Sequence, residues 1–161
     1  QPYNCNKILI NAVLNGFSNI TTIVGAAGDR DGVVTLRDQA PYDKSRLTLQ
    51  AVGMHDQGVE FEVPVWTLDT LVRRQKIEKI RLLKIDVEGH ELAVLRGALP
   101  ILAHTENVIF EDATDMPTEA SAEIRALLLR EGFTLAGVTG EPWNGGPTPE
   151  NNVWARRKHD D

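Results

Sequence analysis

The spacing of apolar positions changes several times along the chain. Apolar residues recur every three or four positions, the spacing of a helix, in four segments: Ile8–Val13, Leu68–Val72, Leu92–Leu99 and Ile124–Leu128. Short apolar or β-branched runs between Gly, Asp and Pro predict strands at Ile20–Val24, Val33–Leu36, Leu47–Val52, Val59–Trp66, Ile80–Ile85, Asn107–Phe110, Thr134–Val138 and Asn152–Ala155. The pattern predicts an α/β fold.

The order of these segments predicts how they pair. No helical spacing separates the three runs between residues 33 and 66, which favours an antiparallel insertion. Further along, strands alternate with helices, which is typical of a three-layer, mostly parallel sheet. The last two strands have no helix between them and predict a C-terminal antiparallel hairpin. We expect Ile20–Val24, Ile80–Ile85 and Asn107–Phe110 to be neighbours in the sheet.

Composition narrows the class of protein. With 17 Lys and Arg against 23 Asp and Glu the chain is acidic and has no basic cluster, so nucleic acid is not an expected partner. No apolar stretch reaches the roughly 20 residues that cross a bilayer, so we expect no membrane span. Cys5 is the only cysteine, which excludes an internal disulfide and a multi-cysteine zinc site and suggests a reducing, cytoplasmic setting.

Candidate chemistry concentrates in Lys84–Glu91, which reads K-I-D-V-E-G-H-E. The spacing changes from strand to helix across this octet, so its polar residues follow a predicted parallel strand, where open α/β sheets bind ligands. Asp86 is the first site candidate, with a helix cap as its alternative. In an extended segment Glu88 lies on the same side as Asp86, so the two carboxylates are candidates for catalysis together. The alternative is that Glu88 only interacts favourably with the positive end of the helix.

The other acidic and aromatic candidates have structural alternatives. His90 is a candidate general base or a first-turn surface residue. Glu91 is predicted to be a solvated carboxylate or one that favours the helix dipole, rather than a catalyst. Glu111 and Asp112 follow the next strand, where they line the substrate side or form a pair of solvated loop acids. Trp143, in the long Gly- and Pro-rich loop Glu141–Glu150, closes over substrate or anchors that loop.

The segment Leu82–Ala98, LLKIDVEGHELAVLRGA, resembles the signature of the FkbM family of methyltransferases. Ala26–Gly32 is similar to the family's A-x-x-D-x-x-G loop, and Asn151–Arg157 to its closing n-v-x-a-r strand. The resemblance implies a class I, Rossmann-like fold and transfer of a methyl group from S-adenosylmethionine to an oxygen of a small molecule, sugar or glycan. It also places the loop of Ala27, Gly28 and Asp29 at the cofactor. Asp29 then lies on the adenine side, and its alternative is a structural turn residue.

The same resemblance implies parts that this sequence does not contain. Family members wrap the methionine part of the cofactor with a glycine-rich loop after the first strand, and bind the ribose with an acidic residue after the second. We find neither pattern here. The chain is therefore expected to be a single, N-terminally truncated methyltransferase domain, its C-terminal two-thirds, and to bind the cofactor weakly and be inactive alone.

Two other functions fit the same residues. Asp86, Glu88, His90 and Glu111 form a carboxylate-rich set typical of a magnesium, manganese or calcium site in a metal-dependent hydrolase. Alternatively the chain is a non-catalytic binding or assembly module. The sequence does not identify the acceptor, the oligomeric state or whether methyl transfer needs a metal.

Overall fold

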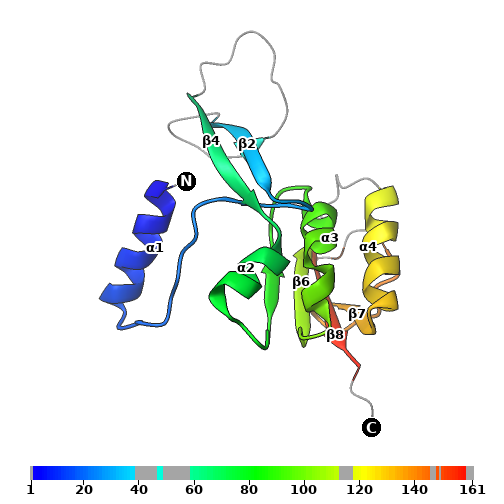
Figure 1. Ribbon diagram of the computed structural model, residues 1–161. Helices are drawn as coiled ribbons and strands as arrows, with labels where there is room; N and C mark the ends of the chain where they lie inside the picture. The colour runs from blue at the N-terminus through cyan, green and yellow to red at the C-terminus, as the bar shows by residue number, and fades with distance from the viewer. Residues whose placement is uncertain are drawn as a thin grey trace. The chain divides into compact units, whose positions relative to one another are not determined.

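The computed structural model describes residues 2–38, 47–48, 59–112, 118–145, 148 and 150–158. The chain divides into two compact units, one of residues 1–26 and 31–66 and the other of residues 27–30 and 67–161 (Figure 1). Helices and strands mix in a way that confirms the α/β class. Within the described ranges no helix has the length and apolar character needed to cross a membrane.

The first unit contains one helix and an antiparallel sheet. Helix α1 (Pro2–Leu14) is followed by a turn at Gly16, whose φ of 76° is a left-handed conformation that glycine adopts at little cost. The sheet order is β1-β4-β2-β3, formed by β1 (Ala26–Ala27), β2 (Gly32–Asp38), β3 (Leu47–Thr48) and β4 (Val59–Trp66). Strands β2 and β4 pair antiparallel over their length, which confirms the predicted insertion. Residues 49–52 of the expected third strand lie outside the described residues.

The predicted strand Ile20–Val24 is wrong. Residues 17–25 carry no strand, and the side chains of Ile20, Ile23 and Val24 are about two-fifths exposed. A β-branched run favours a strand only when a neighbouring strand and a packed face receive it. Among the described residues of its unit no strand pairs with this run, and its side chains stay partly exposed, so its propensity is not realised.

The second unit alternates helices with a four-stranded sheet of order β5-β6-β8-β7. Its elements are α2 (Leu68–Gln75), β5 (Leu83–Ile85), α3 (Glu91–Leu102), β6 (Asn107–Glu111), α4 (Thr118–Arg130), β7 (Phe133–Gly137) and β8 (Asn152–Arg157). Strands β5 and β6 are parallel neighbours, and β7 and β8 form the predicted hairpin. Because β8 also pairs antiparallel with β6, the described sheet is mixed rather than mostly parallel.

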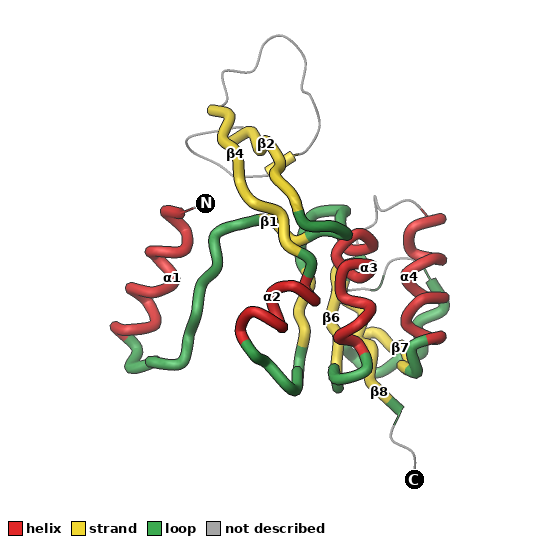
Figure 2. The backbone as a smooth tube through the Cα atoms, in the orientation of Figure 1, coloured by secondary structure: helices red, strands yellow, loops and turns green. Residues whose placement is uncertain are grey.

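The core of this unit lies between one face of the sheet and helices α3 and α4 (Figure 2). Alternation along β6 decides which face is covered, since Val108 and Phe110 are fully buried and Ile109 between them is not. Helix α2 has a side-chain cap at its amino end. The Thr67 hydroxyl accepts the Thr70 amide at 3.1 Å and so caps the first turn of α2.

Arg157, at the end of β8, joins the carboxyl ends of two helices. Its guanidinium donates to the carbonyl oxygen of Thr105 at 2.8 Å, to that of Glu131 at 3.1 Å, and to that of Leu102. The same group lies 4.4 Å from the centre of the Phe133 ring. Carbonyls at the end of a helix have no partners within the helix, so this cation satisfies the carbonyls of Thr105 and Glu131 and adds a second donor to that of Leu102, which also accepts the Thr105 amide.

Candidate functional site

The octet folds as a tight turn between β5 and α3. Strand β5 ends at Ile85, and α3 begins at Glu91 with His90 as its N-cap. Between them Glu88 has a φ of 52° and Gly89 a φ of 95°. A left-handed conformation costs a residue other than glycine about 1–2 kcal/mol, so Glu88 is held there by its surroundings. Asp86 is not the N-cap of α3, which removes the helix-cap alternative for it.

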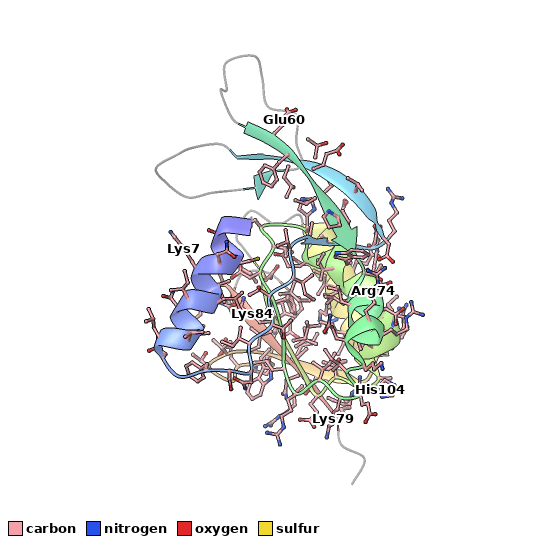
Figure 3. The ribbon with its side chains drawn as sticks, turned by 60° about the vertical axis from the view of Figure 1, so that its left-hand side comes forward. Lys7, Glu60, Arg74, Lys79, Lys84 and His104 are labelled. Carbon is pink, nitrogen blue, oxygen red and sulfur yellow. The ribbon has the colours of Figure 1, made fainter. Side chains whose placement is uncertain are left out.

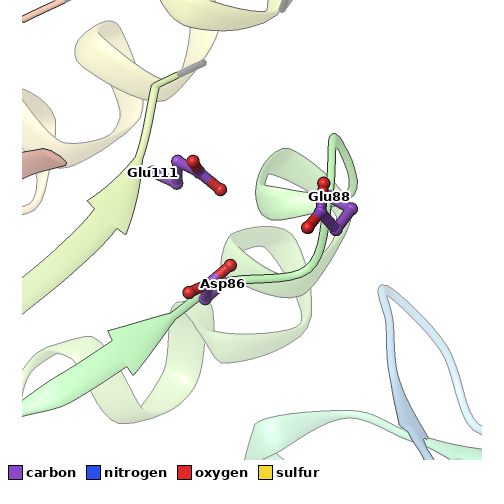
Figure 4. A group of neighbouring side chains, drawn as sticks. All are labelled: Asp86, Glu88 and Glu111. Carbon is purple, nitrogen blue, oxygen red and sulfur yellow. The ribbon is translucent and has the colours of Figure 1, made fainter. Parts of the chain in front are cut away.

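Three carboxylates meet at the end of the sheet. Ile85 and Phe110 are register partners in the parallel pair β5–β6, so Asp86 and Glu111 both come one residue later at the same edge. Each of Asp86, Glu88 and Glu111 offers an oxygen within 4.8 Å of the others, and Figure 4 shows their side chains directed toward a common space. We call this group the acid cluster. His90 is not part of the acid cluster as the described residues form it. The cluster therefore offers only oxygen ligands, which suit a hard cation such as magnesium or calcium.

The environment of the acid cluster is strongly negative. Partial burial is the main cause that raises the pKa of Glu111, and the charges of Asp86, Glu88 and Glu91 raise it further. Lys84, labelled in Figure 3, opposes this effect. Its ammonium group lies 3.5 Å from Asp86 and donates to the side-chain oxygen of Asn152 at 3.1 Å. The edge of the sheet therefore attracts cations and hydrogen-bond donors, such as hydroxyl groups.

Glu91 has a role that the sequence did not predict. It is buried, with 1% of its surface exposed, so the prediction of a solvated carboxylate is wrong, whereas its place in the first turn of α3 fits the helix-dipole alternative. Its Oε1 accepts the amide N–H groups of Val87 at 3.2 Å and Gly89 at 3.3 Å. The signal in the sequence was its place in the first turn of a helix just after a glycine turn, where unpaired backbone donors are available.

Asp112 is also buried rather than solvated. It is 1% exposed, and its Oδ1 accepts the Ser121 hydroxyl at 2.6 Å. Burial raises the pKa of Asp112, hydrogen bonding with Ser121 and Trp143 opposes the rise, and the charge of Glu91 adds to it. The solvated-pair prediction was therefore wrong for Asp112, because the side chain turns toward α4 instead of water.

The raised pKa of Asp112 predicts how stability changes with pH. The folded chain holds this proton to higher pH than the unfolded chain, so stability falls as pH rises from about 4, the ordinary value, through the raised folded value. We expect Asp112→Asn to show a smaller loss of stability between pH 4 and pH 7 than wild type. Urea unfolding at both pH values measures it, with the exposed Glu119→Gln as control. Equal losses in wild type and Asp112→Asn would contradict the expectation.

The remaining predicted site residues lie in different surroundings. Trp143 is 5% exposed and meets the Phe110 ring edge-on, with centres 5.6 Å apart, so it belongs to the core and not to a substrate-facing surface. His90 is exposed at the start of α3. Its side chain makes no capping hydrogen bond.

The loop Ala27–Asp29 belongs to the same unit as the acid cluster. Ala27 packs against the core, and Asp29 is exposed. The carbonyl of Gly28 approaches α3 so closely that a Cβ at Gly97 would overlap it. Gly97 is about 9 Å along the helix from Glu91, so one helix supports both segments.

Comparisons with known proteins agree with the sequence signature. A family described as "Methyltransferase FkbM domain" matches residues 1–135. Among curated proteins, the hexuronic acid methyltransferase AglP of Haloferax volcanii is 34% identical over 99 residues, which cover 54% of this chain and 41% of that protein. The chain thus spans about two-fifths of the length of the curated relative it matches. No solved structure matches it.

Proposed function

Since the chain belongs to the FkbM methyltransferase family, we propose that it transfers a methyl group from S-adenosylmethionine to a hydroxyl oxygen of a sugar, glycan or other small molecule. The observation that carries this proposal is the acid cluster, which gathers hydrogen-bond acceptors at the end of two parallel strands. A hydroxyl acceptor needs a group that orients it and a group that receives its proton. The relative named as a hexuronic acid methyltransferase supports an acceptor of the sugar class.

In the proposed reaction the residues of the acid cluster position the acceptor. Asp86 accepts a hydrogen bond from the acceptor hydroxyl and aims its oxygen along the line of displacement. Glu88 receives the hydroxyl proton as the new carbon–oxygen bond forms and the methyl–sulfur bond of the donor breaks, with the sulfur leaving as a neutral thioether. The exposed His90 is the alternative base. Holding the reactants in attack geometry accounts for much of the acceleration in such displacements. Glu111 completes the polar wall on the neighbouring strand.

The residues present fit one part of the methyl donor. S-adenosylmethionine supplies an electrophilic methyl group on a sulfonium centre. The exposed carboxylate of Asp29 can accept from the adenine amino group, and the close packing of Gly28 on Gly97 holds its loop in place. In the part of the chain that the structure describes, no glycine-rich loop offers backbone donors to the methionine part. We therefore propose that these residues make only part of the donor site.

Donor binding tests the proposal. We expect the 161-residue chain to bind S-adenosylmethionine more weakly than micromolar, because Asp29 and its loop offer too few contacts to offset the cost of ordering the ligand. We expect the protein as its gene encodes it to bind at micromolar or better affinity if it also carries the glycine-rich loop. Calorimetric titration of the two proteins measures the difference in affinity. Asp29→Asn should weaken binding in whichever protein binds S-adenosylmethionine more tightly.

The outcomes separate the alternatives. Tight binding by the 161-residue chain would overturn the incomplete-site proposal. Absence of binding by a gene product that carries the loop would overturn the methyl donor itself and favour a binding or assembly module. Transfer of a labelled methyl group to a panel of sugars and uronic acids then identifies the class of acceptor.

A further inference from the structure

Glu91 holds the turn that directs two carboxylates of the acid cluster. We propose that Glu91 is a positioning residue for methyl transfer, whose buried carboxylate fixes residues 87–89 so that Asp86 and Glu88 face Glu111. The inference rests on the proposed function, since the acid cluster is the site whose geometry it serves. It assigns a role to a side chain outside the predicted catalytic set.

The contacts of Glu91 show how one carboxylate controls this turn. Its Oε1 accepts the amide of Val87 at 3.2 Å and the amide of Gly89 at 3.3 Å. These two amides flank Glu88, whose φ of 52° is left-handed. A residue in that conformation returns to an ordinary one unless its neighbours prevent it. Two hydrogen bonds to one oxygen, on either side of Glu88, supply that restraint.

Glu91, which provides this restraint, belongs to a helix that packs in the core. Glu91 is the first residue of α3, which is anchored among buried residues that include Val94, Leu95 and Ala98. A turn tied to this helix has the same position whether or not an acceptor is present. The direction of the Glu88 side chain is therefore set in advance, which lowers the cost of arranging the site during catalysis.

Because Glu91 is buried, its proposed role is to position other residues and not to contact the substrate. The side chain is 1% exposed, so it does not reach a substrate in the space that the acid cluster faces. Its second oxygen, Oε2, is buried without a hydrogen-bond partner among the described residues. A buried carboxylate with an unpaired oxygen is unfavourable for stability. An apolar residue would avoid that cost but would not hold the amides of Val87 and Gly89.

Three variants of the full gene product test this role. Glu91→Ala removes the restraint, Glu91→Gln keeps an oxygen that accepts both amides without the charge, and Glu123→Ala removes an exposed carboxylate from α4 as the matched control. Hydrogen exchange at the amides of Val87 and Gly89 reports on the turn. Values of kcat and KM for methyl transfer report on the site, and urea unfolding reports on the fold.

We expect faster exchange at both amides in Glu91→Ala, with kcat lower by about 10²-fold and the KM for the methyl donor little changed. Glu91→Gln should restore most of the protection and return kcat to within about tenfold of wild type, which a role based on charge does not predict. If Glu91→Ala does not fold, Glu91→Gln alone tests the proposal. Protected amides and a near-normal kcat in Glu91→Gln support it, and a kcat as low as that of Asp86→Asn overturns it.

Unchanged exchange or unchanged kcat in a folded Glu91→Ala protein would also overturn the positioning role. Faster exchange in that variant, combined with no methyl transfer by wild type on any acceptor, would support the hold on the turn and overturn the proposed function instead.

Discussion

Replacement of Asp86 by asparagine is expected to lower turnover by about 10²-fold or more with little change in melting temperature. The substitution keeps the shape of the side chain and removes the charge that we propose orients the acceptor hydroxyl. The fold should survive, because Asp86 is exposed and its contact with Lys84, at 3.5 Å between two exposed groups, adds little to stability. Steady-state kinetics and thermal unfolding of the full gene product measure both effects.

Asp69→Asn is the matched control for this experiment. Asp69 is also an aspartate in the second unit and pairs with Arg73 at 2.8 Å, four residues along α2 and away from the acid cluster. It should alter turnover by no more than about twofold, since a pair four residues apart on one helix, with an exposed arginine and a partly buried aspartate, contributes little. Normal turnover in Asp86→Asn would show that Asp86 has no part in the reaction. Equal losses in both variants would point to a general effect of charge.

Loss of the Arg157 side chain is expected to have the largest effect on stability, about 2–4 kcal/mol in the free energy of unfolding. The alanine variant removes three hydrogen bonds from a cation to carbonyl oxygens and a contact with the Phe133 ring. It also takes the side-chain donor away from the carbonyls of Thr105 and Glu131, which follow α3 and α4. Urea unfolding of Arg157→Ala against wild type measures the change.

Arg156→Ala provides the control at the adjacent position. Arg156 lies 4.9 Å from the centre of the Trp154 ring and is exposed, so its removal should cost about 0.5–1 kcal/mol. A cost for Arg157→Ala no greater than that for Arg156→Ala would mean that water replaces the guanidinium at the helix ends. Arg157→Lys should recover only part of the loss, because an ammonium group does not reach three carbonyls in a planar fork.

Local patterns predicted the fold where local signals determine it. The parallel pair β5–β6 and the terminal hairpin follow from short stretches of sequence, and the structure confirms both. Ile20–Val24 failed because a strand depends on a neighbour that its own residues do not specify. The pairing of β8 with β6, which makes the sheet mixed, joins segments about 40 residues apart and has no local signal.

The candidate site shows the same division. Adjacent parallel strands imply that Asp86 and Glu111 share an edge, and the acid cluster agrees with that expectation. Burial of Glu91, Asp112 and Trp143 was not predictable, because polar or amphipathic residues take their exposure from contacts made by distant segments. Asp112 illustrates the point, since its partner Ser121 comes from the next helix.

The position of β8 in the sheet has a consequence for synthesis of the chain. β8 is the last of these strands to be made, yet it lies between β6 and β7 instead of at an edge. Until the ribosome has released residue 157, β6 and β7 have no bridge between them, and the faces of Phe110 and Phe133 lack part of their cover. The nascent chain therefore exposes apolar sheet surface late, when chaperones can bind it, and a stop codon before residue 152 should yield aggregates rather than a smaller folded protein.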